Sequence, residues 1–119
     1  MTHQKLEQYR AYLKKQQDEA LRSIRILEEE GRQDEADLFK IRLNILQVFG
    51  TLSAVDERQS ISWEDFCHRH LSRFHTLPAP WRVKLDAAQR YGDTAAQAIE
   101  ETKLSTAAEA ERFLTAIKE

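Results

Sequence analysis

The chain is poor in the residues that cross-link, break or loosen a backbone. Its 119 residues include one cysteine, two prolines and three glycines. The single cysteine, Cys67, excludes an internal disulfide and is typical of a protein in a reducing compartment. Three glycines are too few for a loop-rich all-β domain, and their spacing fits no phosphate-binding loop of the G-x-x-x-x-G type.

The sequence also lacks an apolar segment that would address the chain to a membrane. It contains no uninterrupted run of 18 apolar residues, so we expect no membrane-spanning helix. Residues 1–5 lead into a charged stretch rather than into the short apolar core of a signal peptide. We therefore expect a cytoplasmic protein.

The chain also has no large excess of positive or negative charge. The net charge is −2 and 41% of the residues are hydrophobic, a balance that excludes an intrinsically disordered chain. So small a net charge gives no general reason to expect nucleic acid or a membrane surface as a partner.

The residues that are present follow helical periods throughout. The length predicts a single domain, residues 1–119. Gly31, Gly92 and the Pro78-Ala79-Pro80 stretch separate segments in which apolar residues recur every three or four positions. No segment alternates as a strand does, so we predict an all-α protein with helices over residues 5–30, 34–55, 62–75, 80–91 and 93–118.

The first segment predicts a long helix with one apolar face. Its stripe consists of Leu6, Tyr9, Leu13, Ala20, Ile24 and Leu27. A helix over residues 5–30 is about 39 Å long, whereas a compact chain of this size is only about 35 Å across. We therefore predict an elongated helical bundle of about five helices, built on a long N-terminal antiparallel helical hairpin.

The second segment, residues 34–55, is apolar around most of its circumference. Its apolar positions cover about 240° of a helical wheel and are Leu38, Phe39, Ile41, Leu43, Ile45, Leu46, Val48, Phe49 and Leu52. Such a helix must be covered on two sides, either as the centre of the fold or as half of an oligomer interface. We expect a homodimer formed through this helix. Close approach of another helix would explain Gly50 within it.

Local signals place the remaining boundaries. Ser62 is a good N-cap for the segment 62–75, and Pro80 is well placed to open the segment 80–91. Gly92 can close that segment and Asp93 can cap the last one. Leu104 lies opposite the apolar face of residues 93–118, which leaves open whether the helix breaks near Ser105.

The chemistry-bearing residues are concentrated between positions 67 and 75. Cys67 and His70 are three residues apart on one helical face, so they could ligate a metal or form a thiolate–imidazole pair. His68 and His75 share a different face, so the four side chains cannot converge on one ion. We favour the alternative that Cys67 is a core residue and that His70 lies at the core edge with a hydrogen-bond partner. We assign no catalytic, cofactor-binding or metal-ligating residue.

The small net charge hides a segregation along the chain. Residues 58–92 carry six bases against three acids, and residues 93–119 carry three bases against six acids. The basic 69–90 region, with Arg69, Arg73, Arg82 and Lys84, could bind nucleic acid. The other interpretation, which we favour, is that these bases pair with the last helix or with the acids around the first bend.

Two further charged features stand out. Glu28, Glu29 and Glu30 end the first helix, where negative charge opposes the helix dipole. This leads to the hypothesis that they contact a basic surface, such as the 69–90 region of a second subunit. Arg42 falls inside the apolar arc of residues 34–55, which predicts a structural ion pair. Trp63 and Trp81 are expected to be core anchors.

Together these patterns favour a non-catalytic protein–protein interaction or structural protein that acts as a homodimer without a cofactor. Two alternatives stay open. One is a metal-binding or thiol-dependent protein using Cys67 and His70, and the other is a nucleic-acid-binding accessory protein using the 69–90 region.

Overall fold

The structure, a computed structural model, describes residues 3–119 as an elongated bundle of helices. The helices are α1 (Gln4–Glu29), α2 (Gln33–Gln59), α3 (Trp63–Thr76), α4 (Ala79–Tyr91) and α5 (Thr94–Ile117). No strand occurs among residues 3–119. The chain extends over 45 × 34 × 21 Å, with a radius of gyration of 15.7 Å. The predicted all-α, elongated architecture is confirmed.

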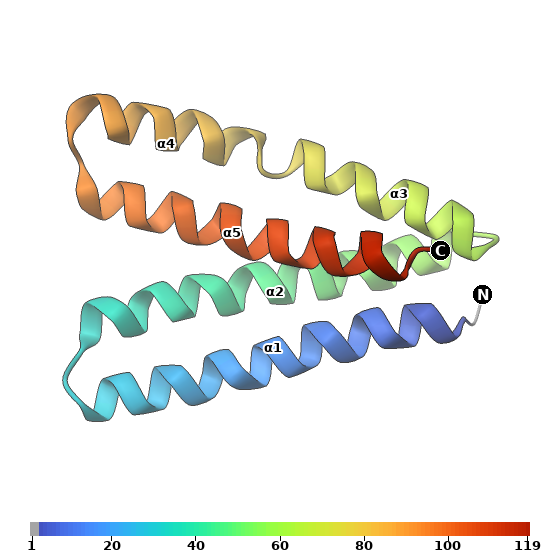
Figure 1. The fold of residues 1–119 in the computed structure, drawn as a ribbon, viewed down its shortest axis with the longest axis horizontal. Helices are drawn as coiled ribbons and strands as arrows, with labels where there is room; N and C mark the ends of the chain where they lie inside the picture. The colour runs from blue at the N-terminus through green and yellow to red at the C-terminus, as the bar shows by residue number, and fades with distance from the viewer. Residues whose placement is uncertain (1–2) are drawn as a thin grey trace.

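The long helices α1 and α2 form the predicted antiparallel hairpin along one side of the molecule (Figure 1). All six residues of the predicted α1 stripe are buried: Leu6, Tyr9, Leu13, Ala20, Ile24 and Leu27. Gly31 takes a positive φ of 74° in the turn between the two helices, which a residue with a side chain rarely adopts. One-sided apolar patterning was therefore enough to define this element.

The second half of the chain runs up and back beside that hairpin. In Figure 1, α3 and α4 run one after the other along the far edge, and α5 returns between them and α2. The α3 helix packs on α2 and α5, whereas α4 packs mainly on α5. The bundle is therefore closed at the α3 end and more open at the α4 end, where the α1–α2 and α4–α5 turns both lie.

The predicted capping signals are in place. The Ser62 hydroxyl accepts a hydrogen bond from the Asp65 backbone N–H at 3.1 Å. The Asp93 carboxylate accepts one from the Ala96 backbone N–H at 3.0 Å. Gly92 ends α4 in the left-handed conformation at a φ of 68°. These contacts satisfy backbone groups that a helix end would otherwise leave without partners.

One helix boundary was predicted wrongly, and the structure answers the question left open at Ser105. The α2 helix does not end near Val55 but continues to Gln59, because Asp56 turns inward and is bonded there. The α5 helix is unbroken near Ser105, because Leu104 faces the α3–α4 junction beside Phe74 and Pro78.

No helix approaches Gly50 closely. The nearest atom to a Cβ placed there is the Gln17 Nε2, in ordinary contact at 3.7 Å. The glycine is therefore not required by packing.

The core lies where α1, α2, α3 and α5 meet. Its largest buried side chains are Leu6, Tyr9, Leu13, Leu46, Phe49, Phe66, His70 and Leu114. The α2 helix is the central element and contacts α1, α3 and α5. By length and composition alone α2 also meets the criterion for a helix that could cross a membrane. A core helix satisfies the same criterion.

Candidate functional site

The candidate residues between 67 and 75 are divided between two faces of α3. Cys67 and His70 point into the core and are buried, whereas His68 and His75 are exposed. The structure thus keeps Cys67 and His70 on one face, as predicted, and separates them from the other two histidines.

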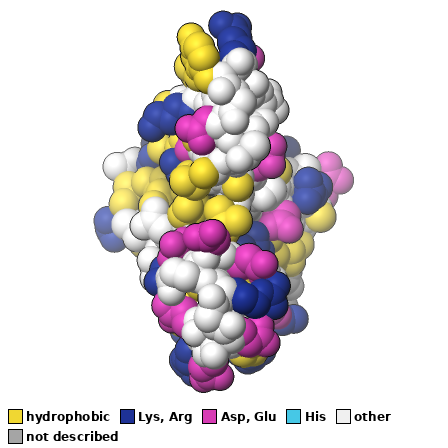
Figure 2. Space-filling model, turned by 90° about the vertical axis from the view of Figure 1, so that its left-hand side faces the viewer, with side chains coloured by type: hydrophobic (Ala, Val, Ile, Leu, Met, Phe, Trp, Pro, Cys, Tyr) yellow, Lys and Arg dark blue, Asp and Glu magenta, His cyan; other side chains and the backbone are white. Residues whose placement is uncertain are grey.

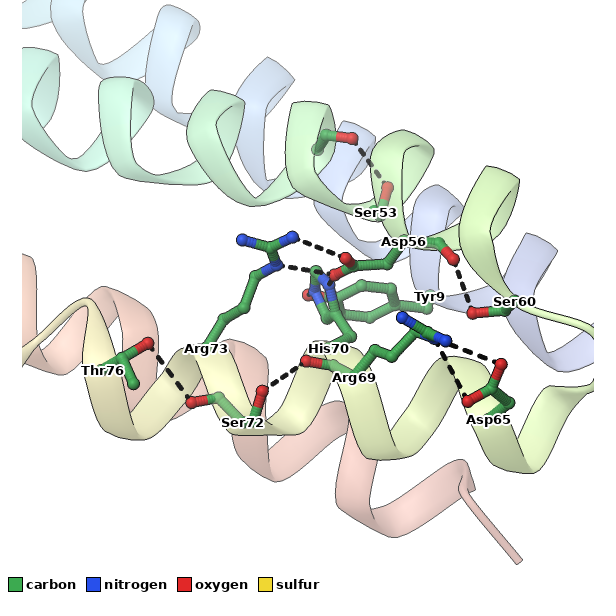
Figure 3. A network of polar contacts seen from close by, with 11 residues as sticks. Tyr9, Ser53, Asp56, Ser60, Asp65, Arg69, His70, Ser72, Arg73 and Thr76 are labelled. Atoms are coloured by element: carbon green, nitrogen blue, oxygen red, sulfur yellow. Dashed lines mark hydrogen bonds and ion pairs between the residues drawn. The ribbon is translucent and has the colours of Figure 1, made fainter.

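His70 lies at the centre of a buried hydrogen-bond network that joins three helices (Figure 3). Its Nε2 is 2.7 Å from the Tyr9 hydroxyl of α1, and its Nδ1 is 2.8 Å from the Asp56 carboxylate of α2. Arg73, one turn along α3, donates to the same carboxylate from Nε at 2.8 Å and from Nη2 at 2.7 Å. Figure 3 shows Asp56 held between the two α3 side chains.

The protonation states in this network follow from its geometry. Burial would raise the pKa of the Asp56 carboxyl, but the hydrogen bonds from Arg73 and His70 outweigh burial and hold that pKa below its ordinary value. Burial lowers the pKa of His70, although the hydrogen bond to Asp56 and its charge act to raise it, so the imidazole is neutral near pH 7. Burial raises the pKa of Tyr9, so its hydroxyl keeps its proton.

Only one arrangement of protons satisfies these groups. Because a carboxylate can only accept, the His70 Nδ1–H donates to Asp56 and the bare Nε2 accepts from the Tyr9 O–H. Among residues 3–119 no buried side-chain nitrogen or oxygen lacks a hydrogen-bond partner. The network is therefore fully satisfied without any ligand.

A tyrosine, histidine and carboxylate in this order could in principle relay a proton. Here, however, Tyr9 and His70 are 0% exposed, so no substrate reaches them. Both nitrogens of His70 are occupied, which leaves no lone pair for a metal or for Cys67. Burial also raises the pKa of the Cys67 thiol to about 11, so it is protonated at neutral pH. The geometry fits a packing role rather than a reactive centre.

The outward face of α3 borders a groove. This groove has a volume of about 660 Å³ and lies between α3 and the end of α5, and its lining includes Trp63, Leu71, His68 and His75. The Trp63 indole donates to the Lys118 backbone oxygen at 2.9 Å and thereby ties the two elements together. Within residues 3–119 no group of three or more His, Cys, Asp or Glu side chains is placed to hold a metal.

Three basic residues of the 69–90 region, Arg69, Arg73 and Arg90, are paired with acidic residues of α2, α3 or α4. Arg69 pairs with Asp65 at 3.2 Å in its own helix, and Arg73 is held by Asp56. Arg90 pairs with Asp86 at 2.9 Å, again within one helix. The predicted pairing of these bases with α5 or with the first bend is therefore wrong. Arg82 and Lys84 are exposed and take part in no ion pair within residues 3–119.

The ion pair predicted for Arg42 is confirmed. Its guanidinium reaches Glu109 of α5 at 2.5 Å and Gln16 of α1 at 2.9 Å, and it donates to the Thr106 hydroxyl at 3.3 Å. The side chain joins α1, α2 and α5 on the open side of the core. Its contacts account for an arginine on the apolar face of α2.

The acidic bend is partly neutralised within the chain. Lys40 binds Glu28 at 3.1 Å, and Arg32 binds both Glu30 and Glu35. Glu29 and Asp34 are exposed, and no ion pair within residues 3–119 includes them.

Comparison with models of protein families, with curated proteins and with solved structures finds no match to this chain. The assignment of the candidate site is therefore based on its geometry alone. Sequence reasoning identified His70 and the need for a partner, but it missed Asp56 and assigned Tyr9 only to the apolar stripe. The one signal for Asp56 was its helical spacing from Phe49 and Leu52, on the same side of α2.

Proposed function

We propose that the protein is a non-catalytic interaction protein that acts as a homodimer through α2. The observation that carries the proposal is the mismatch between the composition of α2 and its burial. An 18-residue stretch of this helix is apolar enough to cross a membrane, yet only 22% of its residues are fully buried, and apolar side chains such as Leu38, Phe39 and Ile41 are half-buried. A second subunit would remove the remaining apolar surface from water.

The first half of α2 offers the clearest place for such a contact. Leu38 and Phe39 are half-buried and line a hollow of about 220 Å³ together with Thr102 and Ser105 of α5. Ile41 is also half-buried. A hollow with an apolar side and a few hydroxyl groups resembles the centre of a protein interface more than the site of a reaction.

The alternatives gain less support from the contacts. A metal or thiol function needs His70 or Cys67 to be available, and both are buried, with the His70 nitrogens already bonded. A nucleic-acid function needs free basic side chains, and Arg69 and Arg73 are engaged within the subunit. The lone buried cysteine supports the proposed cytoplasmic setting.

Sedimentation velocity over a series of protein concentrations tests the proposal. We expect a concentration-dependent dimer that Phe39→Lys weakens at least tenfold, because the substitution places a charge in the proposed contact. Ile61→Lys is the matched control, since Ile61 is 91% exposed in the turn at the other end of the molecule. Far-UV circular dichroism confirms that both variants fold. A wild-type chain that stays monomeric throughout, or equal dimer affinities for the two variants, would contradict the proposal.

A further inference from the structure

The outer face of α4 is an apolar helix surface without a partner inside the subunit. Val83, Ala87 and Tyr91 recur at every fourth position and are exposed, Val83 at 70% and Tyr91 at 87%. Ala88 is the one residue of α4 that is fully buried. An aromatic side chain so exposed on the same helical face as an exposed valine is typical of a contact surface, since aromatic residues are enriched where proteins bind each other.

The charges around this face indicate what could cover it. Residues 79–91 contain three basic residues and one acidic residue. Of these, Arg82 and Lys84 have no ionic partner within the described part of the chain, whereas Arg90 is paired with Asp86. A complementary surface would therefore combine apolar and acidic side chains.

The chain itself carries such a surface, which we call the acidic end and define as residues 26–37. Its stretch from 28 to 37 holds six acidic residues against one basic residue. Ile26 beside it is 48% exposed, and Glu29 and Asp34 are exposed without an ionic partner among residues 3–119. The last turn of α1 contains no basic residue that would offset its dipole. A basic partner would relieve this unfavourable charge.

The acidic end and α4 reach the same end of the molecule, at opposite edges (Figure 1). Figure 2 looks onto this end: apolar side chains gather in the middle, acidic ones are concentrated below them over the α1–α2 turn, and apolar and basic ones project at the upper tip. A twofold axis along the viewing direction of Figure 1, placed beyond its left edge, would bring the acidic end of each copy against α4 of the other.

We infer that a second copy of this chain covers α4, with Val83 and Tyr91 packing on the partner's acidic end and Arg82 and Lys84 facing its carboxylates. The inference rests on the proposed homodimer and specifies how the two copies meet.

A charge exchange tests the inference. The acid variant is Glu29→Lys/Asp34→Lys and the base variant is Arg82→Glu/Lys84→Glu, and none of these substitutions breaks an ion pair within the described residues. Each variant alone should raise the dimer dissociation constant at least about tenfold, measured by sedimentation velocity at low salt. The chain that carries all four substitutions should recover most of the wild-type affinity, because opposite charges face each other again.

The control is Glu7→Lys/Arg58→Glu, which reverses two exposed charges at the opposite end of the molecule and should leave the affinity unchanged. A dimer that responds to Phe39→Lys but to neither charge variant would overturn this inference and leave the proposed homodimer standing. Loss of affinity in each variant without recovery in the fourfold variant would also overturn it. A wild-type chain that is monomeric at every concentration would refute both.

Discussion

Tyr9→Phe removes one oxygen atom from the buried network and leaves the shape of the core unchanged. The phenylalanine ring can keep the edge contact of Tyr9 with His70, whose ring centroid lies 5.2 Å away. What is lost is the hydrogen bond of 2.7 Å to the His70 Nε2. The imidazole cannot compensate by turning over, because its Nδ1–H is held by Asp56.

The magnitude follows from the burial of the group that is left behind. The Nε2 would be an unsatisfied acceptor on a side chain with 0% exposure, which costs about 1–3 kcal/mol. We expect the free energy of unfolding to fall by that amount and the midpoint of urea unfolding to fall by about 1 M. Circular dichroism measures this change at one fixed protein concentration, because association between subunits would make the free energy of unfolding depend on concentration.

Tyr12→Phe is the matched control. Tyr12 lies in the same helix and stacks on Phe113 at 4.3 Å, but its hydroxyl makes no hydrogen bond within the described residues. This substitution should change the free energy of unfolding by less than about 0.5 kcal/mol. If the two variants lost equal stability, or if Tyr9→Phe unfolded as the wild type does, the buried network would not contribute as argued.

Three further predictions concern pH, the backbone and the thiol. The pKa of His70 in the folded chain lies below its ordinary value of 6.5. As the pH falls, His70 is therefore protonated in the unfolded chain before it is protonated in the folded chain. The free energy of unfolding should therefore fall below about pH 6.5, by up to about 1.4 kcal/mol per pH unit. Urea titrations should show a flatter profile for His70→Asn, and equal profiles would refute the assignment. Gly50→Ala should stabilise the chain by about 0.5–1 kcal/mol in the same assay, because the added methyl meets only Gln17; a loss of stability would contradict this. Cys67, 3% exposed with a pKa of about 11, should react with a thiol reagent only after urea is added, and rapid labelling of the folded chain would disprove its burial.

The sequence predicts best those elements whose environment is simple. The α1 stripe was read correctly because α1 buries a single face, so apolar spacing and burial coincide. The caps at Ser62 and Asp93 were equally readable, because a cap depends on neighbours within one turn.

Prediction fails where a contact crosses the fold. His70 was expected to have a partner, but Tyr9 lies 61 residues before it and Asp56 lies 14 residues before it, and no local rule joins them. The end of α2 was misplaced for the same reason. In the sequence Asp56 is a charged residue that indicates the end of the helix. In the fold its carboxylate is bound by Arg73, so the helix continues past it. Leu104 lies opposite the apolar face of α5, and the sequence does not show that the α3–α4 junction covers it there.

The sparse burial of α4 has a consequence for motion. An element with one fully buried side chain that packs mainly on one neighbour contributes little to the global stability and can open without the rest of the bundle. In the isolated subunit the backbone amides of α4 should therefore exchange with solvent deuterium well before those of α1 and α2. Capture of α4 by a second subunit would slow that exchange, and part of the binding free energy would be spent on holding one helix still.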